Sequence, residues 1–239
     1  MEPLGGGINI YVTKSYHFST DTILLAHFAN QRGGRRRVDL GAGCGTIGLL
    51  WLKDDRNLDV SAVELQKDAC TLMQKSAALN GLEEQFHIYN ADLRELKNVL
   101  PFGCFDLVAC NPPYKLSGSG ILNPEDKKLL ARHEAECTLD DVCEAASRLL
   151  QFGGRFCLCQ RPERLPDAME SMRRFDLEPK VLRLVQQRTD KAPKLFLLEG
   201  RRGGKRGYME TLPTLLIEDG KGGFSREMLD IYGNYKTQE

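Results

Sequence analysis

Apolar and polar positions follow two recurring patterns along this chain. Short apolar runs, typical of strands buried on both faces, are followed by stretches in which apolar residues recur every three or four positions, as on an amphipathic helix. We predict strands over 35–40, 58–65, 85–92, 105–110, 153–160, 180–187 and 194–200, and helices over 44–53, 67–81, 138–150 and 161–175. Strands that alternate with helices indicate a doubly wound α/β fold, with a mostly parallel sheet covered on both faces.

Local signals mark several element ends. Gly81 is expected to end the second helix, and Thr138 is expected to cap the start of the third. The strand that ends at Cys110 must stop there because two prolines follow at positions 112 and 113, and each proline lacks a backbone N–H. An asparagine, two prolines and a tyrosine at the end of a buried strand indicate either an unusual turn or a working site.

A glycine-rich turn follows the first predicted strand, in the stretch VDLGAGCGTIG. Gly41 and Gly43 would let the backbone approach a ligand closely, and the next helix would direct free N–H groups at it. The spacing departs from the dinucleotide fingerprint G-x-G-x-x-G. Asp39, at the strand end, would repel a pyrophosphate but could bind the ammonium group of an amino acid. The turn therefore favours S-adenosylmethionine over NAD.

Two further strand ends carry acids that suit the same cofactor. Glu64 lies 23 residues beyond Gly41 and is placed to accept hydrogen bonds from both hydroxyls of a ribose, with Leu65 beside it. Asp92 could accept from an adenine amino group, with Leu93 flanking the ring. The alternatives are a solvated acid for Glu64, and for Asp92 the N-cap of a helix over 93–100.

The segment Asn111, Pro112, Pro113 and Tyr114 ends the fourth strand. The carboxyl ends of parallel strands meet at one edge of a sheet, so this segment should face the same ligand as the loops above. The Asn111 Oδ1 atom and the Pro112 carbonyl can each accept one N–H of a planar NH₂ group, and Tyr114 offers a flat face for stacking. These four residues would form one wall of a binding site, and this wall suits methyl transfer to a planar nitrogen. Its alternative is a proline-terminated strand without a functional role.

Composition narrows the choice of partners and compartment. Lys and Arg number 33, as do Asp and Glu, so a nucleic-acid site must be a local patch. The chain has no signal peptide and no apolar run near the ~18 residues of a membrane span, so we expect a soluble, cytoplasmic protein. We expect reduced cysteines and no metal site, because the eight cysteines form no C-x-x-C pair and the four histidines are scattered. No obligatory protein partner is inferred.

Longer blocks carry a resemblance that covers nearly the whole chain. FSTDTILLAHF, the region from NPPY to GGRF, RPERL and RTDKAPKLFLLEGRRGG together resemble the bacterial valine-tRNA adenine-N6-methyltransferase family. The resemblance implies a class I, Rossmann-like, seven-stranded sheet whose last strand is antiparallel, and methylation of the adenine next to the anticodon. It also implies that Phe18, Thr20 and Asp21 close the cofactor site, although the same stretch reads equally as an ordinary helix capped by Ser19 or Thr20.

The resemblance also predicts how the chain is divided into segments. We expect a single methyltransferase domain over 1–239, with an N-terminal lead-in segment over 1–36, a catalytic core over 37–200, and a basic loop and tail over 201–239. Three basic groups are expected to contact a tRNA substrate, at loops near the carboxyl edge of the sheet. They are Lys115, then Arg188, Lys191 and Lys194, and then Arg201, Arg202, Lys205 and Arg206. The alternative is that the last two groups are solvated loops.

Rival functions share the Asn-Pro-Pro-Tyr wall. A release-factor glutamine methyltransferase presents the same chemistry, because a glutamine amide is also a planar NH₂ group. Such enzymes carry a helical domain in front of the core, and only 37 residues precede Val38 here. A DNA adenine methyltransferase would need a target-recognition region, which the sequence does not contain. A binding module for S-adenosylmethionine without catalysis is disfavoured by the intact wall.

Overall fold

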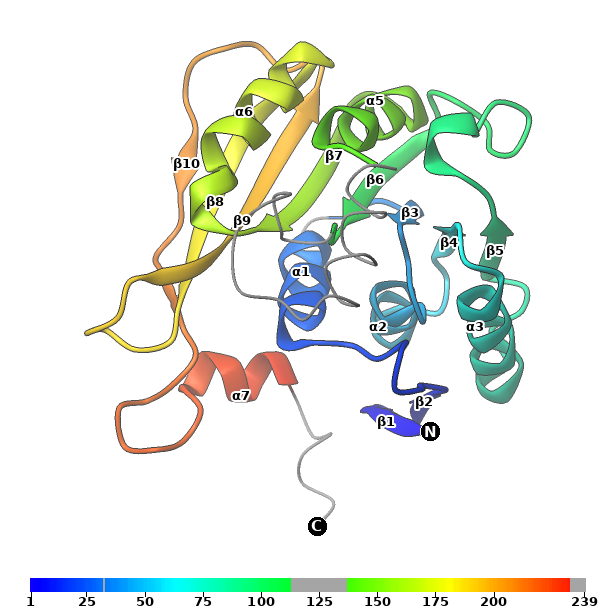
Figure 1. Ribbon diagram of the computed structural model, residues 1–239, viewed down its shortest axis with the longest axis horizontal. Coiled ribbons are helices and arrows are strands. Elements are labelled where there is room, and N and C mark those ends of the chain that lie inside the picture. Colours follow the sequence, from blue (N-terminus) through cyan, green and yellow to red (C-terminus); the bar gives the residue numbers. More distant parts are fainter. Residues whose placement is uncertain (32, 113–136, 233–239) are drawn as a thin grey trace, which may run out of the picture.

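The computed structural model describes residues 1–31, 33–112 and 137–232 (Figure 1). Its strands are β1 (Glu2–Gly5), β2 (Ile8–Ile10), β3 (Arg36–Leu40), β4 (Asp59–Glu64), β5 (Phe86–Asn90), β6 (Phe105–Cys110), β7 (Leu150–Gln160), β8 (Leu177–Gln186), β9 (Pro193–Arg202), β10 (Glu210–Thr211) and β11 (Leu215–Leu216). Its helices are α1 (Thr20–Asn30), α2 (Thr46–Asp54), α3 (Lys67–Asn80), α5 (Leu139–Leu149), α6 (Leu165–Arg174) and α7 (Arg226–Tyr232), with 3-10 turns η1 (Leu93–Glu95) and η2 (Pro162–Arg164).

The central sheet has the order β10-β8-β9-β7-β6-β3-β4-β5. The strands β3 to β7 pair in parallel, whereas β9 runs antiparallel to both of its neighbours, β7 and β8. The predicted doubly wound fold, with an antiparallel last long strand, is therefore confirmed. Within the described residues the sheet has nine strands rather than seven, because the two-residue strands β10 and β11 pair with the outer edge of β8.

Two hydrophobic clusters sandwich the sheet. Alternate residues of β6 serve opposite faces: Leu107 and Ala109 join the cluster that contains α1, α2, α3 and α7, and Val108 and Cys110 join the one that contains α5 and α6. Figure 1 shows these two helical layers on either side of the strands. The continuous apolar runs in the sequence reflect this burial on both faces.

The predicted helix ends at Gly81 and Thr138 are confirmed. Gly81 adopts a left-handed φ of 61° and its N–H bonds back to the last turn of α3. Thr138 forms a capping box with Asp141 at the start of α5. The helix predicted over 93–100 is wrong: only the 3-10 turn η1 forms, and Asn98 lies at φ 69°, which no helix continues through.

Both ends of the chain contain elements that the pattern did not predict. The hairpin β1–β2 packs near α3, where the Asn80 side chain bonds to the backbone N–H and C=O of Asn9. After residue 201, the segment expected to be loop and tail contributes β10, β11 and α7. Strands of two residues are too short to produce a period in the sequence.

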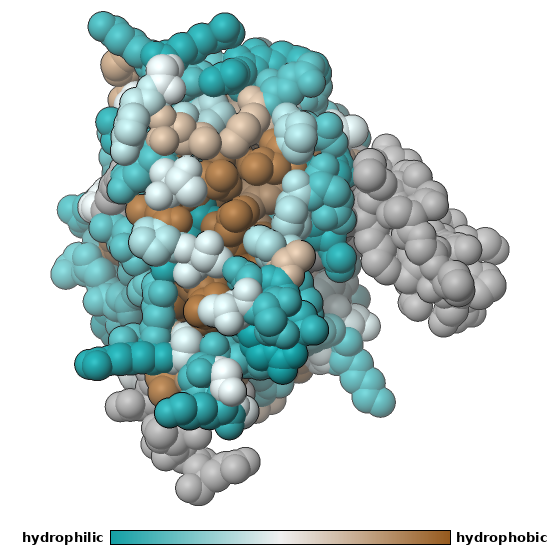
Figure 2. Space-filling model, turned by 90° about the vertical axis from the view of Figure 1, so that its left-hand side faces the viewer, coloured by the Kyte–Doolittle hydropathy of each residue, from teal (hydrophilic) through white to brown (hydrophobic). Residues whose placement is uncertain are grey.

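Figure 2 views the molecule from the side of β8 and β10, where hydrophobic side chains gather between hydrophilic ones.

Candidate active site at the carboxyl edge of the sheet

The parallel register brings the predicted site residues to one edge. Leu40 of β3 lies level with Val63 of β4 and with Cys110 of β6, and Glu64 lies level with Asn90 of β5. The residues that follow these strand ends, predicted to bind cofactor and substrate, therefore emerge at the same edge.

The glycine turn after β3 is bound to the neighbouring strand. The N–H groups of Gly41 and Ala42 both donate to the Val63 carbonyl, at 2.9 and 3.1 Å. Gly41 and Gly43 have φ values of 69° and 55°, which other residues rarely adopt, and the space where a Cβ would stand is open at both. The turn thus leaves room for a ligand against its backbone.

Glu64 ends β4 beneath this turn and is 8% exposed. Its Oε2 atom accepts from the Gly43 N–H at 2.8 Å, and its Oε1 atom accepts from the Gln66 N–H at 2.9 Å. The Asn90 side chain donates to the carbonyls of Glu64 and Leu65, which ties β5 to this loop. Each carboxylate oxygen has a second lone pair, so the oriented group can still accept from a vicinal diol. Leu65 is half exposed beside it.

Asp39 is the most unusual group at this edge. Its side chain is 1% exposed, and within the described residues neither carboxylate oxygen has a hydrogen-bond partner. Burial, and secondarily the charge of Glu64, raises its pKa from 3.8 to about 8. A buried, unpartnered carboxyl group costs folding free energy, and a cationic ligand would relieve that cost.

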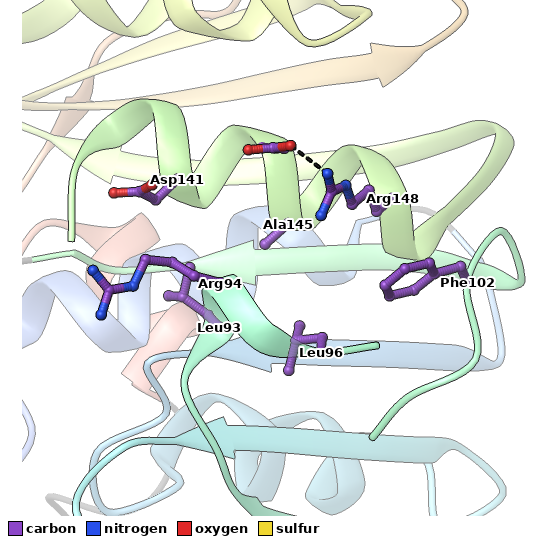
Figure 3. Close-up of a pocket in the computed structure, with 8 residues that line it drawn as sticks. Leu93, Arg94, Leu96, Phe102, Asp141, Ala145 and Arg148 are labelled. Carbon is purple, nitrogen blue, oxygen red and sulfur yellow. Dashed lines mark ion pairs between the residues drawn. The ribbon is translucent and has the colours of Figure 1, made fainter. Parts of the chain in front are cut away.

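Asp92 has the alternative role considered for it, that of an N-cap. Its Oδ1 atom accepts from the Arg94 backbone N–H at 2.9 Å and so caps η1, and the Arg94 guanidinium binds both of its oxygens. These bonds to Arg94 lower the pKa of Asp92. Leu93 and Arg94 also line a pocket between η1 and α5, opposite the Glu144–Arg148 ion pair (Figure 3). An adenine at Asp92 would share the carboxylate with Arg94.

Asn111 and Pro112 follow β6, whereas Pro113, Tyr114 and Lys115 lie outside the described residues. The Asn111 Nδ2 group donates to Thr22 Oγ1 at 3.0 Å across 89 residues of sequence. The first turn of α1 is thereby joined to the predicted catalytic wall. Sequence reasoning did not single out Thr22, although it lies inside the FSTDTILLAHF block.

Residues of the lead-in segment, three of which are predicted to close the cofactor site, contact α7, the core and the loop after Glu64. Thr20 Oγ1 lies 2.8 Å from the Tyr232 hydroxyl of α7, and Phe18 packs on the core cluster of α1 and α2. Asp21 lies in the first turn of α1 and is half-buried. The Tyr16 hydroxyl donates to the Gln66 side chain, next to the Glu64 loop. Tyr16 carried no signal in the sequence, because its contact spans 50 residues.

The two described basic groups lie at opposite edges of the sheet. Leu198 of β9 is level with Cys110 through Leu158, and β9 runs from the carboxyl edge to the amino edge. Lys194, four residues before Leu198, therefore lies with Arg188 and Lys191 at the carboxyl edge. Arg202 lies four residues after Leu198, about 26 Å from Lys194 along the strand. The expectation that Arg201, Arg202, Lys205 and Arg206 lie near the carboxyl edge is wrong.

Two basic side chains of the β8–β9 hairpin have an acidic neighbour. Arg188 and Lys191 each lie within ion-pair distance of Asp190, so part of the positive charge in this hairpin is neutralised. Within the described residues, no cysteine forms a disulfide. Among the described residues, no group of three or more His, Cys, Asp or Glu side chains is arranged to hold a metal ion. No helix in the described part of the chain is long and apolar enough to cross a membrane.

Comparison with known proteins identifies the family. The family model of the methyltransferase small domain matches residues 9–172, which include the glycine turn, Glu64 and Asn111. The chain belongs to the methyltransferase small domain family. Among solved structures, this methyltransferase domain is similar to a predicted O-methyltransferase from Agrobacterium tumefaciens, with a TM-score of 0.70 and 20% identity over 89% of this chain and 95% of that one. It is also similar to a precorrin-6y C5,15-methyltransferase from Geobacter metallireducens, with a TM-score of 0.56 and 14% identity over 84% of this chain and 99% of that one. These two likenesses show the fold.

Sequence relatives carry a more specific name. A tRNA1(Val) (adenine(37)-N6)-methyltransferase of Tolumonas auensis is 31% identical over 58% of this chain and 56% of its own length. A protein of the same name from Parabacteroides distasonis is 28% identical over 75% of this chain and 74% of its own. The match thus spans little more than half of the first of these relatives.

Proposed function

We propose that this methyltransferase domain transfers a methyl group from S-adenosylmethionine to N6 of an adenine in tRNA, at the position next to the anticodon of a valine tRNA. The observation that carries the proposal is Asn111, which follows β6 at the edge that also holds Asp39 and Glu64, with its amide bound to Thr22. The names of the sequence relatives support the substrate. The reaction would take place in the cytoplasm, without a metal and without an obligatory protein partner.

The residues at this edge fit S-adenosylmethionine. The Asp39 carboxyl group, buried and unpartnered within the described residues, is suited to the cofactor's ammonium group. Glu64, already oriented by two backbone N–H groups, is suited to the ribose hydroxyls. Gly41 and Gly43 would admit the cofactor against the turn. Leu65, Asp92 and Leu93 would surround the adenine, and Phe18, Thr20 and Asp21 would lie above the methionine end.

When bound, the cofactor supplies an electrophilic methyl group on a sulfonium. The chain's own task is to prepare the nitrogen that attacks it, whose lone pair is delocalised into the adenine ring. The Asn111 Oδ1 atom and the Pro112 carbonyl each accept one N–H, which stabilises positive charge developing on that nitrogen. Tyr114 would stack on the base. A base inside a duplex is out of reach, so the target must lie in a loop or be flipped out.

The proposal is tested by incubating the protein with labelled S-adenosylmethionine and total tRNA that lacks the modification. Digestion should yield labelled N6-methyladenosine, and it should come from valine tRNA. A parallel reaction with a release factor tests the rival function. Label on a release-factor glutamine and none in RNA would replace the proposal with protein methylation. Label in neither would leave a domain that binds the cofactor without catalysis.

The pH dependence of cofactor affinity should report Asp39. Its pKa of about 8 means that the group is mostly neutral at pH 7 and must lose a proton to bind an ammonium group. Affinity should rise about tenfold per pH unit up to pH ~8 and fall above it, as the cofactor's α-amino group (pKa about 8) loses its own proton. Calorimetry between pH 6 and 9 would measure this maximum and the release of one proton at pH 6–7. An affinity independent of pH would contradict the ammonium assignment.

The position of the β8–β9 hairpin leads to a prediction about tRNA. Lys191 and Lys194 are exposed at the carboxyl edge, the edge to which the proposal assigns the target adenine. Reversing both charges should raise the KM for tRNA about tenfold and make binding less dependent on salt, because two phosphate contacts are lost. The matched variant K205E/R206E makes the same charge change at the amino edge. Equal KM values for K191E/K194E and wild type would remove this hairpin from the RNA footprint.

A further inference from the structure

We infer that Thr22 is a positioning residue that sets the orientation of the Asn111 amide. The inference rests on the proposed function and concerns a contact between α1 and the end of β6. An asparagine side chain has two ends of similar shape and opposite hydrogen-bonding character. Only the oxygen end can accept an N–H of the target amine. With the amide turned over, two NH₂ groups would face each other and the substrate nitrogen would lose an acceptor.

The Thr22 hydroxyl holds the other end of that amide. Asn111 Nδ2 donates to Thr22 Oγ1 at 3.0 Å. Thr22 Oγ1 also lies 3.4 Å from Ser19 Oγ, and because either oxygen can donate in this contact, Ser19 can accept the Thr22 hydroxyl hydrogen. With that hydrogen directed at Ser19, Thr22 presents a lone pair to Asn111. This arrangement selects the NH₂ end of the amide for α1, and the opposite end for the substrate side.

The position of the hydroxyl is itself constrained. Thr22 is β-branched, so its χ1 angle has few alternatives in a helix. The residues that follow it, Ile23 and Leu24, are 3% and 1% exposed in the core, and they anchor the first turn of α1. Thr20 in the same turn bonds to Tyr232 of α7. The acceptor offered to Asn111 therefore belongs to a fixed part of the fold rather than to a mobile loop.

The inference requires Thr22 to act through orientation and not through stability or cofactor binding. Replacing Thr22 by valine keeps the branched shape and removes the hydroxyl. The Asn111 amide would then have no acceptor on α1 to select its NH₂ end. We expect kcat to fall about tenfold, since small losses of alignment have large effects on group transfer. The affinity for S-adenosylmethionine and the KM for tRNA should remain near wild type.

The test compares T22V with T22S, which restores a hydroxyl at the same atom, and with T71V. The hydroxyl of Thr71 bonds to the carbonyl of Lys67 within α3, so T71V controls for a threonine-to-valine change on a helix. Activity is measured together with the side-chain amide resonances of Asn111 by NMR. In T22V we expect lower kcat and shifted Asn111 amide protons, with both restored in T22S and unchanged in T71V.

Two results would overturn the inference: wild-type kcat in T22V, or an equal loss of kcat in T22S. Its failure is separable from that of the proposed function. An inactive wild type on every RNA and protein substrate would refute the proposed function, while the Asn111 amide resonances would still show whether Thr22 orients that group. An active wild type with an unaffected T22V would refute only the role of Thr22.

Discussion

Asp39→Asn should weaken S-adenosylmethionine binding about 100-fold and, at the same time, make the ligand-free protein more stable. The loss of affinity follows from removing the charged partner of a buried ion pair, an effect of about 2–5 kcal/mol. The gain in stability follows from the pKa of the same group. Asp39 ionises freely in the unfolded chain, near its ordinary pKa of 3.8, but only near pH 8 in the folded protein.

The sign of the stability effect is set by this raised pKa. The contribution of the Asp39 carboxyl group to stability is fully present below pH 3.8 and is lost progressively as the pH rises to about 8. Asparagine takes up no proton on folding, so the stability of the variant does not fall with rising pH in this way. The difference in melting temperature between Asp39→Asn and wild type should therefore grow between pH 4 and pH 8 and reach about 5 °C or more.

Thermal melts with and without S-adenosylmethionine measure both effects in one experiment. The cofactor should raise the melting temperature of wild type strongly and that of Asp39→Asn little. Glu64→Gln is the control: it also weakens cofactor binding, but the Glu64 carboxylate accepts from two backbone N–H groups, so its loss should raise the melting temperature less than Asp39→Asn does. A destabilised Asp39→Asn variant at pH 8 would contradict the assignment of Asp39 as an uncompensated buried acid.

There is a physical reason why the sheet, and the position of the loops after its strands at one edge, can be predicted from the sequence. Parallel strands buried on both faces are mostly apolar, so β4, β6 and β7 are visible as apolar runs. Once they are parallel, the residues after them must share an edge. The length of η1 was not predictable in the same way, because a helix cannot continue through the left-handed backbone of Asn98 (φ 69°), and the residue type alone does not reveal that conformation.

Two other features depended on long-range geometry. Arg201 and Arg202 lie far from the predicted carboxyl edge because the two ends of β9 lie at opposite edges of the sheet. An antiparallel strand that follows β8 through a short hairpin must begin at the carboxyl edge and end at the amino edge. The bond between Thr22 and Asn111 had no sequence signal, because a threonine near a helix start has several local partners and only the fold brings β6 beside α1.

Asn111→Ala should reduce kcat for methyl transfer by about 100- to 1000-fold, because it removes one of two acceptors for the amine on which charge develops. Folding and cofactor affinity should change little. The residue lies after the end of β6, is half-buried, and its side chain donates to Thr22 of α1. The prediction therefore separates catalysis from binding at a single position.

Asn111→Asp is the matched variant. It keeps the shape of the side chain and an oxygen toward the substrate, and its second oxygen can accept from the Thr22 hydroxyl where the amide formerly donated. We expect Asn111→Asp to retain more activity than Asn111→Ala, with single-turnover rates on tRNA separating the chemical step from product release. Equal rates for the two variants would show that the amide NH₂, not the oxygen, is the working part of Asn111. Wild-type rates in Asn111→Ala would remove this residue from the chemistry and leave the Pro112 carbonyl as the acceptor to test.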